Sequence, residues 1–562
     1  MSEKGSIYLT TSSQRGTNWK LIIAVFTFLC LGAFHLTTSA FEPCAMMFNK
    51  EDVSEQLCPL PTPIEMKELD TVRYILNDPS FREEAAGKLS GAVQIDTVVY
   101  DIMEKSDYDK FINFHSYLEK TFPEVYERAQ IHKVNDWGLV FEFPGKNEAL
   151  KPVLLMAHQD TVPIGDENDW SENPWSGRYD GEKVFGRGSS DCKELLIGLL
   201  STMQKIIQDG KDDFERGLLF CFGFDEERSG TDGARHIGEW IFDNYGPNSI
   251  DHIIDEGGQL FSEIDGDYFG IVVNAEKGYI DVKVEVDTPG GHSSIPKDHT
   301  SIGIISKFLV AYEEDMFKPT LSDDNPTLNI LECAAEHGSL PEPLANAAKL
   351  ARTSKKARDI LLKYIDSDLM LKYNVRTTQA IDMIVGGDKA NALPRKVEAI
   401  INHRIAHGET SDDVFAKLSK HAMWVSKKYG LGLSVDDIQI FPATVNGEIK
   451  ISTFRSPLET APVTAINDDI WNTYTGLVRT FYEQEVFPEK FTTGKKMIIS
   501  PGLMTGNTDT RHYWKVTDHI YRCQPGVTEN SFVHGPNEFA SVDSYLQVIA
   551  FYYNYILEAL SK

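Results

Sequence analysis

The pattern of hydrophobic positions predicts strands that are buried on both faces. Residues 153–156, 218–224 and 253–254 are short, continuous apolar runs. Such runs are typical of parallel strands that are covered by helices on both sides. A helical period with apolar residues between 195 and 207 follows the first run and stops at Gly210. The alternation of strand and helix predicts an α/β fold with a largely parallel sheet.

The hydrophobic period changes after residue 278. Apolar residues from 280 to 286 alternate with Asp281, Lys283 and Glu285, which predicts a strand with one solvent-facing side. A mostly helical stretch follows at 305–375, so we predict a domain inserted into the α/β domain. The predicted parts are a cytosolic tail (1–20), a transmembrane anchor (21–40), a lumenal linker (41–59), the first part of the α/β domain (60–277), the inserted domain (278–440) and the second part of the α/β domain (441–562).

The predicted anchor is an apolar segment near the amino terminus. Twenty helical residues at about 1.5 Å each just span a hydrocarbon core of roughly 30 Å. Lys4, Arg15 and Lys20 precede the segment, which favours a cytosolic amino end and a lumenal remainder, the type II orientation. The alternative is a cleavable signal peptide that ends at Thr38-Ser39-Ala40.

The net charge and the cysteines limit which partners and which cellular compartment the sequence is compatible with. The 562 residues include 55 basic and 84 acidic ones, a net charge of −29, which argues against a nucleic-acid partner. Cys192 and Cys221 lie in apolar runs and are predicted to be buried free thiols. Cys44 and Cys58 can close a small loop in an oxidising lumen. The chain contains no Asn-x-Ser/Thr sequon, so we expect no N-linked sugar.

Acidic and imidazole groups follow each of the predicted parallel strands. His158 and Asp160 follow the first, Asp225-Glu226-Glu227 the second, and Asp255-Glu256 the third. The carboxyl ends of parallel strands share one edge of a sheet, so these groups should converge. Their convergence needs a compensating positive charge, which metal ions supply. The simpler alternatives are a hydrogen-bonded histidine, a solvated acidic turn and, for Asp191, a helix N-cap.

Five motifs in this order resemble one enzyme family. They are Ala-His-Gln-Asp-Thr-Val-Pro (157–163), Gly-Arg-Gly-Ser-Ser-Asp (186–191), Asp-Glu-Glu (225–227), Asp-Glu-Gly-Gly (255–258) and Gly-Gly-His-Ser-Ser (290–294). The family is that of the co-catalytic zinc exopeptidases, which include aminoacylase and glutamate carboxypeptidase. The anchor and the length are most similar to the fungal vacuolar carboxypeptidase S group. The resemblance implies a catalytic domain with a mixed, largely parallel sheet flanked by helices, an inserted α+β lid or dimerisation domain, and a vacuole- or lysosome-like lumen.

The resemblance also implies two Zn²⁺ ions per chain and a role for each polar residue. Glu226 would be the general base, and Asp160 would orient His158. Asp255 and Glu256 point to opposite faces of a strand, so only one should bind metal, and we favour Asp255. His534 is the expected last ligand, with His512 as the weaker candidate. The bond between Asp191 and Cys192 is expected to be cis. The implied metal ligands are His158, Asp191, Glu227, Asp255 (or Glu256) and His534.

Three residues of the inserted domain are implied to contact substrate. His292 would polarise the scissile carbonyl, and Asn391 would hydrogen-bond the substrate near the metals. Arg404 has the two-pronged geometry that binds a carboxylate, although a surface ion pair is the alternative. These residues can come from the same chain or from a second copy in a homodimer.

The implied activity is hydrolysis of the C-terminal peptide bond of dipeptides and N-blocked short peptides, with release of a free amino acid. An N-acyl amino acid hydrolase or synthase is the alternative within the family. A catalytically dead, membrane-anchored binding protein is the alternative of another class. Such proteins typically lose ligands or the base, whereas every position is filled here.

Overall fold

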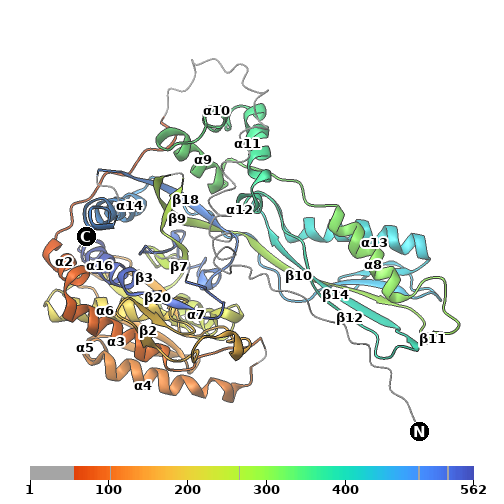
Figure 1. Cartoon of the computed structure of the whole chain (residues 1–562), viewed down its shortest axis with the longest axis horizontal. Coiled ribbons are helices and arrows are strands. Elements are labelled where there is room, and N and C mark those ends of the chain that lie inside the picture. Colours follow the sequence, from red (N-terminus) through yellow and green to blue (C-terminus); the bar gives the residue numbers. More distant parts are fainter. Residues whose placement is uncertain (1–55, 102, 265, 491–493, 528–530, 562) are drawn as a thin grey trace, which may run out of the picture. The chain divides into compact units, whose positions relative to one another are not determined.

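A computed structural model describes residues 56–561, apart from 102, 265, 491–493 and 528–530. The predicted tail and anchor (1–40), most of the linker and Cys44 lie outside the described residues. No helix in the described ranges is long and apolar enough to span a bilayer. The main domain is built on a nine-stranded mixed sheet (Figure 1). Its strands, in spatial order, are β1 (Gln130–Val134), β2 (Gly138–Phe143), β6 (Leu218–Gly223), β3 (Val153–His158), β7 (Ile253–Gln259), β19 (Ile520–Gln524), β9 (Asp267–Glu276) and β18 (Met497–Met504), with β8 (Phe261–Ile264) paired to β9.

Helices bury the central strands of this sheet. β3 and β6 are buried at every position, which confirms the prediction of strands covered on both faces. The predicted helix after Asp191 is α6 (Lys193–Gln208), and it packs against the closing helix α16 (Val542–Ala559). The other helices of this domain are α2 (Leu69–Asn77), α3 (Pro79–Val93), α4 (Phe111–Thr121), α5 (Pro123–Arg128), α7 (Ala234–Tyr245), α14 (Asp469–Phe481) and α15 (Phe487–Lys490).

The three strands that carry the polar motifs are neighbours. β3 pairs in parallel with β6 on one side and with β7 on the other. The predicted convergence at their carboxyl ends is therefore confirmed: His158, Asp225 and Asp255 all come from one edge of the sheet. A small sheet of β4 (Arg178–Tyr179), β5 (Lys183–Phe185) and β20 (Phe539–Ser541) joins the loop before Asp191 to the segment after His534.

The inserted domain, hereafter the lid, has its own six-stranded sheet and core. The strand predicted to have one wet face, β10 (Gly278–Asp287), lies in the interior of this sheet, and Asp281 and Glu285 are both buried. The alternation is confirmed, because the apolar residues of β10 lie in the lid core and Lys283 on the other face is half-buried. Asp281 and Glu285 are less exposed than expected because neighbouring strands supply partners: Asn402 donates to Asp281, and Lys396 pairs with Glu285. The sheet order is β12 (Ala380–Gly386), β14 (Lys396–Ile405), β10, β17 (Glu448–Thr453), β15 (Gly432–Val435) and β16 (Ile438–Phe441).

The lid sheet extends beyond the boundary predicted at residue 440, because β17 is one of its strands. Helices α8 (Ser301–Glu314) and α13 (Ser411–Tyr429) cover it. A two-stranded ribbon of β11 (Gly291–His292) and β13 (Ala392–Leu393) projects from the same domain. The remaining helices are α9 (Pro326–His337), α10 (Glu342–Leu350), α11 (Lys355–Ser367) and α12 (Leu369–Lys372), of which α9 packs against β18 of the main sheet.

A disulfide joins the first described segment to α9. Cys58 bonds to Cys333, 275 residues later, so it does not form the small loop with Cys44 that the sequence left open. The two cysteines meet in a small core with Phe269 and Ile498. Cys192 and Cys221 are buried free thiols, as predicted.

Removing this bond should weaken the fold. A protein with both Cys58→Ser and Cys333→Ser should lose about 2–4 kcal/mol of unfolding free energy, because the bond restrains a long loop of the unfolded chain. Denaturant unfolding of oxidised samples measures the change. A reductant should destabilise the wild type and leave the double variant unchanged, and equal sensitivity of both proteins to reductant would contradict this assignment.

Candidate functional site

Asp191 lies between two histidines that come from distant parts of the chain. Its Oδ1 is 3.0 Å from His158 Nε2, and its Oδ2 is 3.0 Å from His534 Nε2. The N-cap alternative for Asp191 does not apply, because α6 begins after Cys192 and Asp191 makes no cap. The peptide bond between Asp191 and Cys192 is cis, as expected. A carboxylate in this position can bridge two cations, one beside each imidazole.

One further carboxylate joins each histidine. Glu227 Oε2 lies 3.3 Å from His534 Nε2, and Glu256 Oε1 lies 3.5 Å from His158 Nε2. In this structure Glu256, rather than Asp255, lies beside His158; the Asp255 Oδ1 accepts the backbone N–H of Glu256, and its buried Oδ2 has no hydrogen-bond partner. Among the described residues, two groups of side chains can hold a metal ion, and they share Asp191. One consists of His158, Asp191, Cys192 and Glu256, and the other of Asp191, Glu227 and His534.

The weaker histidine candidate and the first acid of the triplet have structural contacts instead. His512 donates from Nε2 to the Ser229 carbonyl and belongs to neither group. Asp225 is buried and accepts the backbone N–H groups of Asp232 and Gly233 at the start of α7. Asp225 thus fixes the turn that presents Glu226 and Glu227.

Asp160 connects His158 to this acidic turn. The Nδ1 of His158 lies 3.0 Å from the Asp160 carbonyl and 3.3 Å from its carboxylate, which leaves Nε2 free for a cation. The same carboxylate accepts the backbone N–H groups of Glu226 and Glu227, each at 3.1 Å. Asp160 therefore orients an imidazole and two carboxylates at once.

The electrostatics of the site favour bound cations. Burial, then Asp191, raises the pKa of Glu227 to about 7, and its Oε1 is buried without a hydrogen-bond partner. Burial, then Glu256, raises the pKa of Glu226 well above its ordinary value. Hydrogen bonds to Asp191 and Glu227 raise the pKa of His534 to about 10. The carboxylates offer oxygen ligands, one of them unpartnered, and the imidazoles offer nitrogen ligands. Zinc binds both kinds of ligand, so these residues fit a pair of zinc ions.

A buried ion pair that the sequence did not reveal fixes the two metal-facing loops. Arg187 pairs with Glu538, and both side chains are almost completely buried. Glu538 Oε1 accepts the backbone N–H groups of Ser190 (3.0 Å) and Asp191 (3.2 Å), while Arg187 donates to the His534 carbonyl (3.2 Å). Arg187 lies within the Gly-Arg-Gly-Ser-Ser-Asp motif, which was the available signal.

Breaking this pair should be costly. Arg187→Met leaves the Glu538 carboxylate buried without its cation, and we expect a loss of about 3–5 kcal/mol of unfolding free energy. Denaturant unfolding measures it. Lys146→Met, which breaks an exposed pair with Asp213, is the matched control and should leave the midpoint unchanged. An Arg187→Met midpoint equal to that of the control would refute the role of the pair.

The structure separates the three predicted lid residues into two places. His292 and Asn391 are exposed and adjacent on the β11–β13 ribbon, where the Ser293 N–H donates to the Asn391 carbonyl. Within the described ranges, neither contacts the carboxylates around Asp191. Arg404 is half-buried at the end of β14, and its Nη1 donates to Asn507 Oδ1 at 2.8 Å. No described carboxylate forms an ion pair with Arg404, which removes the ion-pair alternative.

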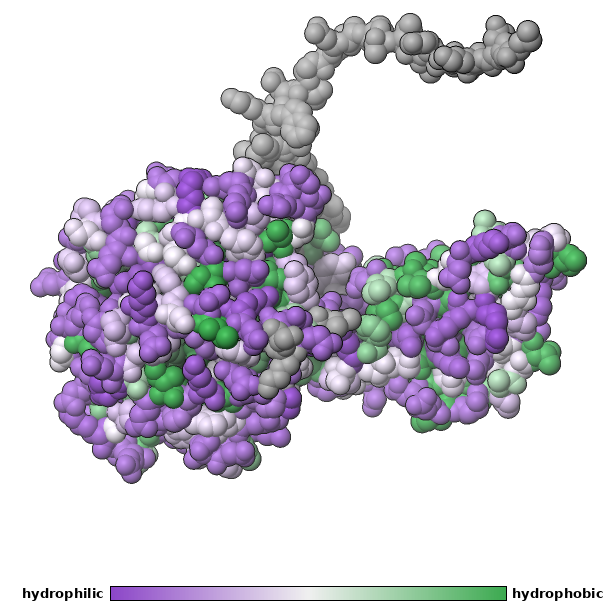
Figure 2. Space-filling view, turned by 90° about the horizontal axis from the view of Figure 1, so that it is seen from below, coloured by the Kyte–Doolittle hydropathy of each residue, from purple (hydrophilic) through white to green (hydrophobic). Residues whose placement is uncertain are grey.

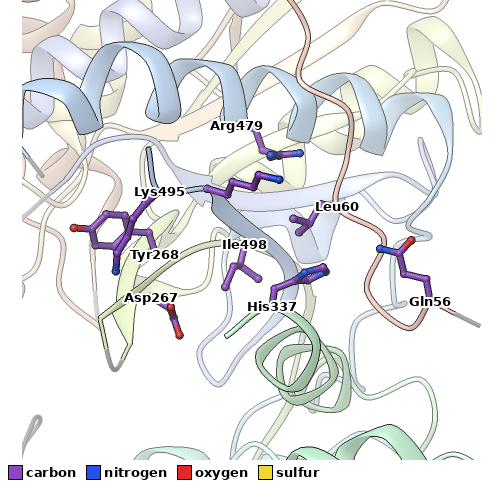
Figure 3. Close-up of a pocket in the computed structure, with 9 residues that line it drawn as sticks. Gln56, Leu60, Asp267, Tyr268, His337, Arg479, Lys495 and Ile498 are labelled. Carbon is purple, nitrogen blue, oxygen red and sulfur yellow. The ribbon is translucent and has the colours of Figure 1, made fainter. Parts of the chain in front are cut away.

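Two cavities compete as the reaction site, and their chemistry distinguishes them. One, of about 290 Å³, is lined by Asp191, Glu226, Glu227, Glu256 and His534, together with Asn507 and Thr508. The other, of about 430 Å³, lies between α9, α14 and the segment around Leu60 (Figure 3). Two of its polar groups are already engaged: the buried Arg479 donates to Glu483 and the Pro61 carbonyl, and the half-buried His337 donates to the Cys58 carbonyl. The reactive groups therefore belong to the smaller cavity.

Comparison with known proteins identifies the family of the chain. The model of peptidase family M20/M25/M40 matches residues 154–558. Carboxypeptidase S of Saccharomyces cerevisiae is 37% identical over 556 residues, which cover 95% of each chain. The N-fatty-acyl-amino acid synthase/hydrolase PM20D1 of Bos taurus is 29% identical over 83% of this chain and 86% of its own.

Solved structures show the same fold. Human carnosine dipeptidase 1 superposes with a TM-score of 0.61 at 15% identity, over 88% of this chain and 99% of that one. The M20 family metallo-carboxypeptidase Sso-CP2 of Sulfolobus solfataricus gives a TM-score of 0.58 at 17% identity, over 84% and 98%. From its motifs, its fold and the match to the family model, the chain belongs to peptidase family M20/M25/M40.

Proposed function

We propose that the protein is a di-zinc carboxypeptidase that hydrolyses the C-terminal peptide bond of dipeptides and N-blocked short peptides. The observation that carries the proposal is the pair of metal-holding groups that share Asp191 and open into one cavity with Glu226. The likeness to carboxypeptidase S over almost the whole chain supports the same activity.

The residues have distinct roles in the proposed reaction. His158, Asp191 and Glu256 would hold one zinc ion, and Asp191, Glu227 and His534 the other. When bound, the two ions would polarise the scissile carbonyl and lower the pKa of water. Glu226 would take a proton from the attacking water and deliver it to the leaving amine, as a positioned general base does. Arg404 would bind the free carboxylate of the substrate. His292, supplied by the lid, would stabilise the developing oxyanion, and Asn391 would hydrogen-bond the substrate.

The alternative is hydrolysis or synthesis of N-acyl amino acids, which the PM20D1 relative favours. The likeness to carboxypeptidase S is the stronger of the two, at 37% identity against 29%. Activity on N-blocked dipeptides should therefore exceed that on N-fatty-acyl amino acids.

A substrate panel with metal control tests the proposal. The purified protein should contain about two zinc ions per chain and release free amino acids from N-blocked dipeptides. A chelator should abolish release, and added zinc should restore it. Stronger activity on N-fatty-acyl amino acids would favour the alternative, and a metal-bound protein without hydrolytic activity would indicate a binding protein.

The location is a further part of the proposal. Residues 21–40 would anchor the protein as a single-pass type II membrane protein, with the catalytic domain in a vacuole-like lumen. The described Cys58–Cys333 disulfide supports an oxidising compartment.

An exposed edge of the lid sheet supports a homodimer as part of the proposal. β12 is an edge strand whose Met383, Ile384 and Val385 are all more than half exposed. Hydrophobic residues are visible on the lid surface in Figure 2. We expect two copies to associate through this edge, since a long apolar edge strand readily pairs with another chain. Pairing of the lids would also let one copy supply His292 and Asn391 to the other.

A charge on this edge should separate the copies. Ile384→Lys should convert the dimer to a monomer in light scattering, because a lysine blocks edge pairing. The control is Ile438→Lys on β16, the opposite edge of the same sheet, where Ile438 is 67% exposed. Dissociation by both variants, or by neither, would place the interface elsewhere.

A further inference from the structure

The loop from Met504 to Thr508 joins the metal cavity to the base of the lid. Asn507 lines the cavity. Its Oδ1 accepts from Arg404 Nη1 at 2.8 Å, and its Nδ2 donates to the Lys277 carbonyl at 2.6 Å. Lys277 lies between β9 of the main sheet and β10 of the lid sheet. One amide side chain thus contacts the cavity, the lid arginine and the connection between the two domains.

The backbone beside Asn507 is held by a buried network. The N–H and hydroxyl of Thr508 donate to Glu276 Oε1 at 2.8 and 3.0 Å. Glu276 Oε2 lies 3.1 Å from Arg522 Nε, and both side chains are at most 1% exposed. Asn507 is therefore presented from a rigid support, as a residue that orients another side chain should be.

Neighbouring residues hold the Arg404 side chain in position without neutralising its positive charge. Its guanidinium lies over the ring of Tyr279, its cross-strand partner, with 5.0 Å to the ring centroid. The Asn507 amide oxygen accepts one N–H, and no described carboxylate pairs with the guanidinium. The positive charge and the remaining donors are left for a ligand. A neutral amide can hold a guanidinium in this way without cancelling its charge.

We propose that Asn507 determines the specificity for a free C-terminal carboxylate, by holding the Arg404 guanidinium at the edge of the metal cavity. The inference rests on the proposed carboxypeptidase activity, and no sequence motif pointed to it. Alanine at position 507 would leave the guanidinium without this support. Aspartate there would pair with Arg404 and compete with the substrate carboxylate.

The test compares an N-blocked dipeptide acid with its C-terminal amide on full-length, zinc-loaded protein. The ratio of the two kcat/KM values measures discrimination for the carboxylate. Asn507→Ala should reduce this ratio about 10- to 100-fold, mainly through KM for the acid, because one charged hydrogen bond is weakened. Asn507→Asp should reduce it at least as far. Asn244→Ala on the exposed side of α7 is the matched control and should keep the wild-type ratio.

A binding measurement separates this inference from the proposed function. In the Glu226→Gln background, calorimetry gives the affinities for the acid and the amide without turnover. Equal discrimination with and without Asn507→Ala, at unchanged zinc content, would overturn the role of Asn507 and leave the proposed function intact. A wild type that hydrolyses neither compound would overturn the proposed function, while loss of binding discrimination in Asn507→Ala would still support the inference.

Discussion

Asp191→Asn should remove both metal ions and reduce kcat/KM at least about 1,000-fold. Each Asp191 oxygen faces a different histidine at 3.0 Å, so one side chain serves both ion positions. An amide offers one weaker oxygen ligand and one nitrogen that carries hydrogens, and it lacks the negative charge. The lost electrostatic stabilisation is several kcal/mol, and each 1.36 kcal/mol is about tenfold in rate.

Elemental analysis and steady-state kinetics on the same sample check this result. Zinc should fall from about two ions per chain to less than one. The control is Asp180→Asn, in an exposed turn where an amide oxygen can accept the same backbone N–H groups. Retention of two tightly bound ions in Asp191→Asn would show that Asp191 does not bridge them.

Glu226→Gln should keep the metal and lose turnover by about 10²–10⁴-fold, the contribution expected of a positioned general base. Glutamine preserves the volume of the side chain but cannot accept and return a proton. Glu226 belongs to neither metal-holding group, whereas the adjacent Glu227 contacts His534.

Glu227→Gln provides the comparison. It should reduce zinc content as well as kcat, so the two adjacent substitutions are distinguished by metal analysis. A Glu226→Gln protein with undiminished kcat would remove the base assignment, and one that has lost zinc would turn Glu226 into a ligand.

The ends of the buried strands could be predicted from the sequence because their pattern is local. The apolar runs before His158 and Asp225 set the strand boundaries, and parallel pairing then brings the polar groups to one edge. The choice between Asp255 and Glu256 as a metal ligand depends on contacts with distant parts of the chain. The pairing of β7 with β19 shifts register just after Asp255, and Arg522 lies opposite that residue. Only the fold shows that Glu256, rather than Asp255, lies beside His158.

Contacts between distant segments of the chain could not be predicted from the sequence, because no local pattern marks them. Cys58 and Cys333 lie 275 residues apart, and the sequence offered only the nearby Cys44 as an open possibility. Arg187 and Glu538 have no apolar periodicity that would mark them as buried. The solvent exposure predicted for one face of β10 was only partly right, because alternation shows which side chains share a face but not which polar partners the neighbouring strands supply.

The Cys58–Cys333 bond changes what a protease can release. A single cut in any exposed loop between these two cysteines leaves both fragments in one covalent piece, and that stretch includes His158, Asp191 and Glu226. The nicked protein should migrate as an intact chain on a non-reducing gel and separate into two bands only after reduction.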